Sequence, residues 1–363
     1  MISPKKLFTE LKKNDISFFS GVPDSILKKF INYLPKNNNH IIASNEGSAV
    51  GIAIGYNLSK KKIGCVYLQN SGLSNAINPL ISIANPKVYS IPILLIIGWR
   101  GSPLVEDEPQ HKIKGSITPD LLKLLKIKYV ILKKNNDMKK IKKLVTFSKK
   151  NNKIVALLVE KGAFINDSIK KAKDIYSVNK ETFLKKLLEN INAKTKIICS
   201  TGFNSREIMF IRKKYGISKG KDFYMVGGMG HTSSVALGYS MFKKNQTICL
   251  DGDGSLLMHL GSLKTVSKFA KGNLKYILLN NGTHDSVGGH PTYANTINFS
   301  NLVKSLGIKK YHSIKSNKDI KKKLTIFLKE KKPSFLEVKI RNNNNKKLPR
   351  PENLIKIKNN FIN

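Results

Sequence analysis

The sequence is poor in cysteine, tryptophan and acidic residues. Its 363 residues include three cysteines, one tryptophan and 23 Asp and Glu, against 65 Lys and Arg. The cysteines, Cys65, Cys199 and Cys249, stand alone within or beside apolar runs, which excludes a disulfide framework and a cysteine metal site. We therefore expect three buried thiols in a reducing compartment.

Long apolar runs are also missing. None approaches the roughly 20 residues that a membrane-spanning helix needs, and residues 1–13 lack the apolar core of a signal peptide. The sequence predicts a cytoplasmic protein with no membrane contact.

The shortage of acidic residues gives a formal net charge of +42. Such a charge raises the alternative of a basic nucleic-acid-binding protein. The lysines, however, occur in short runs such as 60–62, 321–323 and 331–332, within a chain rich in Asn and Ile. No zinc-finger, basic-zipper or aromatic RNA-binding signature accompanies them. We interpret them as solvated faces, expect no nucleic-acid partner, and note that a positive field attracts small anionic substrates.

Short β-rich runs alternate with amphipathic helical stretches along the whole chain. This alternation is typical of parallel sheets with helical crossovers, so we predict an α/β fold of two doubly wound parallel-sheet domains. The predicted domains are residues 1–165 and 181–363, joined by a polar linker at 166–180. The predicted strands are 16–20, 41–43, 63–68, 93–97, 129–132 and 154–159 in the first domain, and 196–200, 223–226, 247–250, 276–279, 311–314 and 334–339 in the second.

Glycine-rich turns follow many of these strands. In doubly wound sheets ligands bind beyond the carboxyl ends of the strands, where glycine lets the backbone approach them. Residues 101–119, with three carboxylates, three prolines and His111, are predicted to form a long functional loop.

The strongest single signal is the string Gly252-Asp253-Gly254-Ser255 after a strand, followed one βα unit later by Asn280-Asn281-Gly282-Thr283. Magnesium prefers hard oxygen ligands shared with phosphate oxygens. Asp253 offers a carboxylate, Asn281 an amide oxygen and Thr283 a backbone carbonyl. The following helix N-terminus offers free N–H groups to a diphosphate. The sequence thus predicts a metal and diphosphate site.

Two other kinds of site have sequence patterns similar to parts of this region. A calcium-binding EF-hand loop starting at Asp251 fails, because its twelfth position is Ser262 instead of glutamate. A dinucleotide-binding fingerprint starting at Gly228 has Ser233 at its third glycine position. It stays a minor alternative.

The spacing of Gly-Asp-Gly and Asn-Asn resembles the signature of thiamine-diphosphate enzymes, and nearly all of the chain is similar to that family. The resemblance implies a pyrimidine-binding domain and a diphosphate-binding domain without the usual middle domain. It also implies thiamine diphosphate and Mg²⁺ as cofactors, and a homo-oligomer, at least a dimer, with active sites between subunits.

The resemblance assigns roles to residues in both domains. Glu46 would hydrogen-bond the aminopyrimidine ring and favour the tautomer that removes the cofactor proton; the alternative is a carboxylate that stabilises a helix start. Asp24 and His111 resemble the acid and histidine that handle protons in related decarboxylases; a turn aspartate and a surface histidine are the alternatives. The residues that would bind the cofactor are Gly202, Ser205, Gly227, Gly228, Met229, Gly252, Gly254 and Ser255, with Met229 as the wedge beneath the cofactor unless it is a core methionine.

Longer strings resemble the 2-oxo-acid decarboxylases that act on phosphonopyruvate or sulfopyruvate. They include residues 69–73, 98–101, 107–111 and 284–292. The resemblance implies decarboxylation of phosphonopyruvate to phosphonoacetaldehyde, toward phosphonates of the 2-aminoethylphosphonate type. Sulfopyruvate decarboxylation and a related carboligation are the alternatives. A phosphonate needs cationic and N–H donors, for which we predict Arg100, Gly288 and Gly289.

Overall fold

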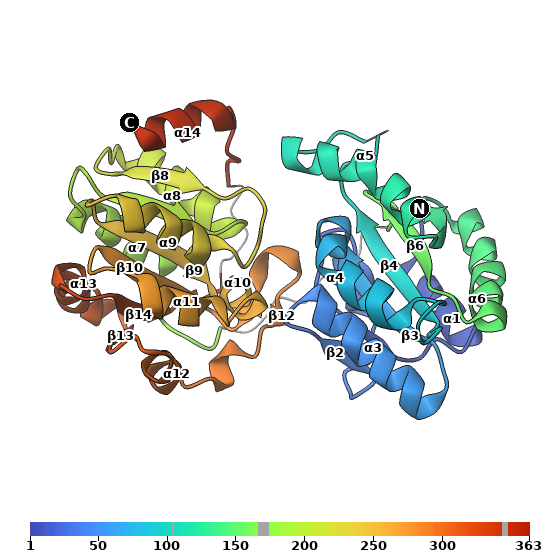
Figure 1. The fold of residues 1–363 in the computed structure, drawn as a ribbon. Helices are drawn as coiled ribbons and strands as arrows, with labels where there is room; N and C mark the ends of the chain where they lie inside the picture. The colour runs from blue at the N-terminus through green and yellow to red at the C-terminus, as the bar shows by residue number, and fades with distance from the viewer. Residues whose placement is uncertain (104, 166–173, 343–347) are drawn as a thin grey trace. The chain divides into compact units, whose positions relative to one another are not determined.

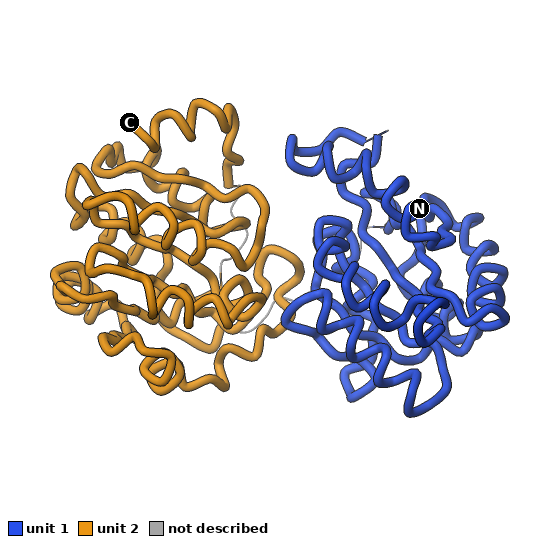
Figure 2. Tube along the Cα trace, viewed as in Figure 1, with its two compact units in different colours: residues 1–171 blue, residues 172–363 orange. Residues whose placement is uncertain are grey.

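The structure is a computed structural model, and it describes residues 1–103, 105–165, 174–342 and 348–363. The chain divides into two compact units, residues 1–171 and 172–363 (Figure 2). Part of the predicted linker, residues 166–173, lies outside the described residues, as do residue 104 and residues 343–347.

Unit 1 is a six-stranded, wholly parallel sheet with helices on both faces (Figure 1). The strand order is β2-β1-β3-β4-β6-β5. Helices α1, α2 and α6 pack on one face, and α3, α4 and α5 on the other. The strands are β1 (Phe19–Gly21), β2 (His40–Ile42), β3 (Gly64–Gln69), β4 (Ile93–Trp99), β5 (Lys128–Leu132) and β6 (Val155–Glu160); the helices are α1 (Pro4–Lys13), α2 (Lys28–Ile31), α3 (Glu46–Lys60), α4 (Leu73–Pro79), α5 (Pro109–Leu124) and α6 (Lys139–Asn151), with the short turns η1 (Asn70–Gly72), η2 (Leu80–Ala84) and η3 (Asn135–Met138).

Unit 2 has a second six-stranded parallel sheet, in the order β13-β14-β10-β9-β7-β8. When the six strands of each large sheet are numbered in chain order, both sheets have the order 2-1-3-4-6-5, which in unit 2 runs from β8 to β13. Helices α7, α8 and α13 pack on one face, and α9 to α12 and α14 on the other. The strands are β7 (Lys196–Cys199), β8 (Lys221–Tyr224), β9 (Thr247–Gly252), β10 (Leu274–Asn280), β13 (Lys310–Ile314) and β14 (Ser334–Lys339), with a small hairpin of β11 (Thr283–His284) and β12 (His290–Pro291); the helices are α7 (Lys180–Asn190), α8 (Phe203–Tyr215), α9 (Thr232–Phe242), α10 (Asp253–Met258), α11 (Ser262–Phe269), α12 (Phe299–Leu306), α13 (Ile320–Lys329) and α14 (Leu354–Ile362), and the short turns are η4 (Asp285–Val287), η5 (Ala294–Thr296) and η6 (Asn317–Asp319).

The predicted fold class is confirmed, and all twelve predicted strands overlap strands of the two large sheets. Central strands such as β4 and β10 are buried along their whole length, as expected for parallel strands covered on both faces. The three cysteines are free and buried, as predicted. None of the helices in the described ranges is long and apolar enough to cross a bilayer.

The predicted long loop at 101–119 is wrong in its second half, because α5 begins at Pro109 and runs through Pro119. Pro109 suits a first helical turn, where no N–H donor is needed. Pro119 lacks the N–H that would bond the carbonyl of Gly115. That carbonyl instead accepts a 2.9 Å hydrogen bond from Nε1 of Trp99. The indole therefore replaces the missing helical bond.

Candidate functional site

In each unit the strand order reverses direction around the first strand, between β1 and β3 and between β7 and β9. Doubly wound sheets bind ligands beyond the carboxyl ends of the strands at this switch point. The predicted site residues follow those ends: Asp24 comes after β1, Arg100 after β4, Gly202 after β7, Asp253 after β9 and Asn281 after β10. The topology thus places the candidates of each unit at the carboxyl end of its sheet.

Asp253 is the first residue of α10 and is 3% exposed. Its Oδ2 accepts a hydrogen bond from Oγ1 of Thr292 at 2.5 Å. Burial raises the pKa of Asp253 to about 7, and the hydrogen bond from Thr292 only partly opposes that effect. Hydrogen bonds from backbone N–H groups also lower the pKa, but burial outweighs them, so a cation would stabilise this carboxylate as an anion.

The turn after β10 places two asparagines next to each other. The side-chain oxygen of Asn281 accepts a 3.2 Å hydrogen bond from the N–H of Thr283, so it folds back over the turn. Asn280 points the other way, since its amide donates to Glu337 at 2.8 Å while its oxygen accepts from the N–H of Gly282 at 3.1 Å. Glu337 and Asn280 thereby fix the backbone that carries Asn281 and Thr283.

The predicted glycine turns have the backbone that their roles need. Gly202, the residue before α8, has φ +86°, and Gly228 and Gly230 have φ +63° and +90°, values that favour glycine. The N–H of Gly230 donates to Oγ of Ser255 at 3.1 Å, which joins this turn to α10. The hydroxyl of Ser205, by contrast, donates to the Ser200 carbonyl at 2.7 Å inside the unit.

The remaining candidates of unit 2 have no described interaction that assigns them a ligand. Gly252 comes directly before Asp253, and a Cβ on Gly254 would lie 2.6 Å from the His284 ring. Met229 is half-buried and Gly227 exposed. Gly288 and Gly289 have φ +117° and +72° in the turn between β11 and β12.

Glu46 is the first residue of α3, which Asn45 caps by accepting a 2.8 Å hydrogen bond from the N–H of Ser48. The Glu46 carboxylate is 5% exposed and accepts a 3.0 Å hydrogen bond from Asn75. A Cβ on Gly72 would lie only 2.0 Å from Oε1 of Glu46, so this approach requires glycine. Burial raises the pKa of Glu46, opposed by the hydrogen bond from Asn75 and the charge of Lys114.

Asp24 and His111 are polar groups in unit 1 with unused hydrogen-bonding capacity. Asp24 is 1% exposed; its Oδ1 accepts from the N–H groups of Ile26 and Leu27, each at 2.8 Å, while Oδ2 is buried without a partner among the described residues. Burial raises its pKa to about 6. Nδ1 of His111 is likewise buried without a described partner, and burial lowers the pKa of His111 to about 4. Such unsatisfied groups are typical of functional sites.

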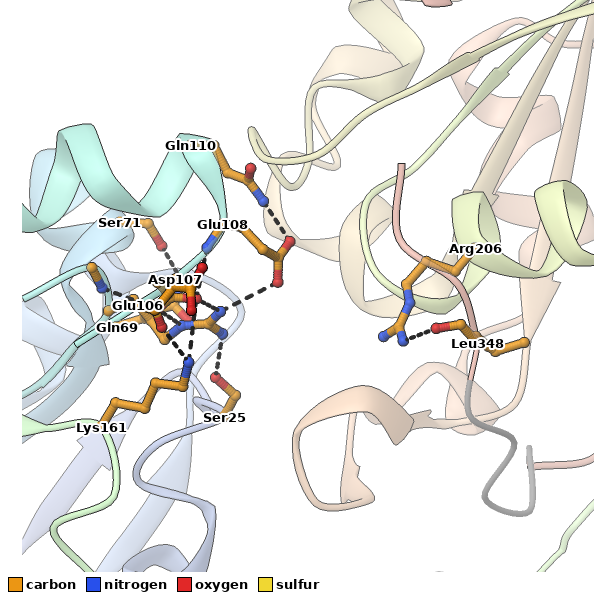
Figure 3. A network of polar contacts seen from close by, with 12 residues as sticks. Ser25, Gln69, Ser71, Glu106, Asp107, Glu108, Gln110, Lys161, Arg206 and Leu348 are labelled. Carbon is orange, nitrogen blue, oxygen red and sulfur yellow. Dashed lines mark hydrogen bonds and ion pairs between the residues drawn. The ribbon is translucent and has the colours of Figure 1, made fainter. Parts of the chain in front are cut away.

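The Arg100 side chain bonds to residues of a polar network, of which Ser25, Asp107 and Glu108 are labelled in Figure 3. Its guanidinium donates two hydrogen bonds to Asp107, one of them 2.6 Å long, one to Glu108 at 3.3 Å and one to Ser25 at 3.1 Å. Nζ of Lys161 is 3.8 Å from Asp107. The structure therefore ties the turn after β1 to the segment before α5 through Arg100.

Sequence reasoning missed side chains that contact the predicted site residues or their neighbours: Asn75 on Glu46, Thr292 on Asp253, Asn342 on Thr283, and Glu337 on Asn280 beside Asn281. Thr292 and Glu337 follow Asp253 and Asn280 by 39 and 57 positions, so no local spacing connects them. The one available signal was Glu337 itself, a carboxylate between Leu336 and Val338 in a predicted strand.

Comparison with known proteins agrees with this architecture. The N-terminal TPP binding domain of thiamine pyrophosphate enzymes matches residues 5–123, and their C-terminal TPP binding domain matches residues 209–338. A phosphonopyruvate decarboxylase of Streptomyces viridochromogenes is 30% identical over 97% of this chain and 92% of its own length. A sulfopyruvate decarboxylase of Methanosarcina acetivorans is 25% identical over 93% of this chain and 91% of its own. The beta subunit of a sulfopyruvate decarboxylase from Methanothermobacter thermautotrophicus is 40% identical over 31% of this chain and 57% of its own.

Two sheets of one topology, each with its polar residues at the switch point, and matches to both TPP binding domains define the class: this chain belongs to the thiamine pyrophosphate enzymes. Within that family it is a decarboxylase, similar over nearly its whole length to the phosphonopyruvate decarboxylases.

Proposed function

We propose that this protein decarboxylates 3-phosphonopyruvate to phosphonoacetaldehyde and carbon dioxide with thiamine diphosphate and Mg²⁺, in the cytoplasm and toward phosphonates of the 2-aminoethylphosphonate type. The observation that carries the proposal is the 30% identity to a phosphonopyruvate decarboxylase along nearly the whole of both chains. In the reaction the bond between C1 and C2 of the substrate breaks, carbon dioxide leaves, and a proton adds to C2.

The donor set of unit 2 fits the implied cofactor. Asp253, Asn281 and the Thr283 carbonyl would supply one anionic and two neutral oxygens, the kind of partial shell that magnesium takes when phosphate completes it. Among the described residues no cluster of three or more His, Cys, Asp or Glu could hold a metal, so a softer transition-metal site is not favoured there. Gly202, Gly228 and Gly230 would let the backbone approach the diphosphate and the rings.

When bound, thiamine diphosphate supplies a carbon nucleophile and an electron sink for the carboxylate electrons. The residues of unit 1 supply proton control. Burial raises the pKa of Glu46, so its carboxyl group would keep a proton and donate it in a hydrogen bond to the aminopyrimidine ring. Asp24 and His111 would handle the proton that C2 gains, because each keeps a polar atom that no described residue bonds. Arg100, Gly288 and Gly289 remain predictions for groups around the substrate.

We also propose a homo-oligomer with active sites between subunits. Support comes from the two TPP binding domains carried by one chain, together with a relative that is called a beta subunit.

The test is an assay of the purified protein with phosphonopyruvate, sulfopyruvate and pyruvate, in which carbon dioxide and aldehyde are both measured. We expect the highest specificity constant with phosphonopyruvate. A site with donors for a phosphonate leaves them unpaired when pyruvate binds, and unpaired donors are costly. A comparable specificity constant for pyruvate would contradict the substrate and leave the cofactor assignment intact.

Sulfopyruvate is the second candidate substrate. The relative from Methanosarcina acetivorans, 25% identical over 91% of its length, favours it. A higher specificity constant with sulfopyruvate in the same assay would select this alternative.

A further inference from the structure

The most obvious cation for an anionic substrate, Arg100, is largely occupied. Asp107 and Glu108 together oppose its charge, and the remaining described hydrogen bond of its guanidinium is to Ser25. Burial raises the pKa of Asp107, but the hydrogen bonds and charge of Arg100 outweigh that effect and hold it below its usual value. Binding of a phosphonate by Arg100 would therefore compete with a carboxylate pair already in place.

A different cation lies on the inward face of α5. Lys114 follows His111 by three residues and precedes Thr118 by four, so the three share one face of the helix. This face packs tightly, since a Cβ on Gly115 would lie 1.7 Å from the carbonyl oxygen of Gly101. Thr118 accepts a 3.0 Å hydrogen bond from Asn70. The packing holds Lys114 over η1.

The Lys114 ammonium has only a weak neutral partner. Nζ lies 3.4 Å from the carbonyl oxygen of Ser71, and the side chain is half-buried. None of the ion pairs among the described residues includes Lys114, although several other lysines have one. A half-buried ammonium that meets only a long bond to a carbonyl has donors to spare.

The ammonium also lies beside the predicted catalytic groups. Ser71, its carbonyl partner, is followed by Gly72, whose Cα lies against the Glu46 carboxylate. The positive charge of Lys114 acts on Glu46, and it adds to the burial that lowers the pKa of His111. Lys114 and Glu46 thus lie on two sides of one short turn.

We propose that Lys114 is the residue that binds the terminal anionic group of the substrate, a phosphonate or sulfonate on the carbon next to the 2-oxo group. The proposal rests on the proposed function. The anion replaces the Ser71 carbonyl as the partner of Nζ and forms a charge-assisted hydrogen bond, which is shorter and stronger than the neutral one it displaces. In this proposal Lys114 takes the substrate-binding role that the sequence predicted for Arg100, and Arg100 is a positioning residue that holds Asp107 and the turn of Ser25.

The test compares Lys114→Gln and Lys114→Arg with Lys112→Gln, a matched loss of charge on an exposed position of the same helix. We expect Lys114→Gln to lower kcat/KM for phosphonopyruvate by about 10- to 100-fold, mainly through KM, the scale of one hydrogen bond to a charged group. Activity on pyruvate should change little. Lys114→Arg should recover part of the loss, and Lys112→Gln should behave like the parent enzyme.

A binding measurement complements the kinetics. Phosphonoacetate, an unreactive anion with the same terminal group, should inhibit the parent enzyme and inhibit Lys114→Gln at least about tenfold less well, while thiamine diphosphate binds both equally.

Three outcomes would overturn the inference: Lys114→Gln that matches Lys112→Gln, an equal loss on phosphonopyruvate and pyruvate, or unchanged inhibition by phosphonoacetate. Failure of the proposed function looks different, because the parent enzyme would then release no carbon dioxide from either phosphonopyruvate or sulfopyruvate.

Discussion

The two units have the same strand order, but the polar groups that follow their strands differ in how fully they are hydrogen-bonded. After the third strand of unit 2 comes Asp253, whose carboxylate is hydrogen-bonded, and after the fourth comes Asn281, whose amide oxygen is bonded as well. After the first strand of unit 1 comes Asp24, which keeps a buried oxygen without a described partner, and Nδ1 of His111 is in the same condition.

The difference teaches how one topology serves two tasks. A turn whose polar atoms are already bonded is rigid and suits the binding of a metal and a diphosphate. A turn with unsatisfied titratable atoms is costly to bury but keeps groups that can exchange protons with a ligand. Four substitutions test whether hydrogen-bonded and unsatisfied polar groups serve these two different tasks.

The largest effect is expected in the bonded turn. Loss of a residue that only supports a metal ligand typically lowers metal affinity by about 10- to 100-fold. Asp253→Ala removes the one anionic ligand itself, so it should weaken Mg²⁺-dependent binding of thiamine diphosphate by more than that. Titration with the cofactor at fixed Mg²⁺, followed by calorimetry, measures it. Asp319→Asn, a change at a partly exposed surface carboxylate, is the control. Tight binding by Asp253→Ala would place the metal elsewhere.

Glu46→Gln should retain cofactor binding but lose turnover by about 10²- to 10⁴-fold, the range for removal of a general acid or base. The reason is that an amide cannot exchange the proton that the carboxyl group provides. Deuterium exchange at the C2 position of the bound cofactor separates chemistry from binding. Asn75→Ala, which removes only the neighbouring hydrogen bond, should slow exchange much less. Exchange at the parental rate in Glu46→Gln would remove Glu46 from the catalytic role.

Glu337→Ala should destabilise unit 2 by about 1–3 kcal/mol, because it leaves the buried amide of Asn280 and the hydroxyl of Tyr311 without their acceptor. Urea denaturation measures the stability. Tyr311→Phe removes one bond and should cost about 1 kcal/mol. If Glu337 also fixes the turn of Asn281, its loss should weaken cofactor binding while Tyr311→Phe leaves it close to parental. Equal cofactor affinities for all three proteins would limit Glu337 to stability.

The effect of Asp24→Asn is expected at only one end of the pH range, because the cost of burying Asp24 depends on its charge. The folded pKa of Asp24, about 6, exceeds its ordinary value of 3.8. Between these two pH values the folded state binds one more proton than the unfolded state. The stability that this proton contributes is therefore fully present below about pH 4 and is lost as the pH rises through 6. Asp24→Asn should raise the unfolding free energy near pH 7.5 by on the order of 1–3 kcal/mol relative to the parent and make no such difference near pH 4. Unfolding curves at both values test it. A variant equally destabilised at both pH values would show that burial of the charged Asp24 carboxylate does not lower the stability of the parent.

Local chemistry explains which features the sequence predicts well. Parallel strands buried on both faces are largely continuous apolar runs, so strands such as β3, β4 and β6 could be located within two residues. The strand predicted from Ile16 starts at Phe19, because the backbone N–H of Ile16 bonds to Leu11 and still ends the preceding helix. The helix at Pro109 was missed because prolines at both 109 and 119 argue for a loop, and the compensating Trp99 bond is a tertiary contact.

The candidate site divides in the same way. Asp253 and Asn281 stand in short strings that follow strands, so their positions could be predicted from order along the chain. The ion pair of Arg100 with Asp107 could not be predicted, since only the folded loop brings the two side chains together. Likewise, no local pattern distinguishes Lys114 from the many other lysines until α5 and η1 are packed together.

The bond between Trp99 and Gly115 also provides an optical reporter. Trp99 is the sole tryptophan of the chain and is 5% exposed, so all indole emission from the protein comes from one buried position. Its N–H is held at 2.9 Å by a carbonyl of α5, the helix that carries His111 and Lys114. Any displacement of that helix on substrate binding would change the polarity around the indole and shift the emission wavelength. The unlabelled enzyme can therefore report movement of α5 in a stopped-flow fluorimeter.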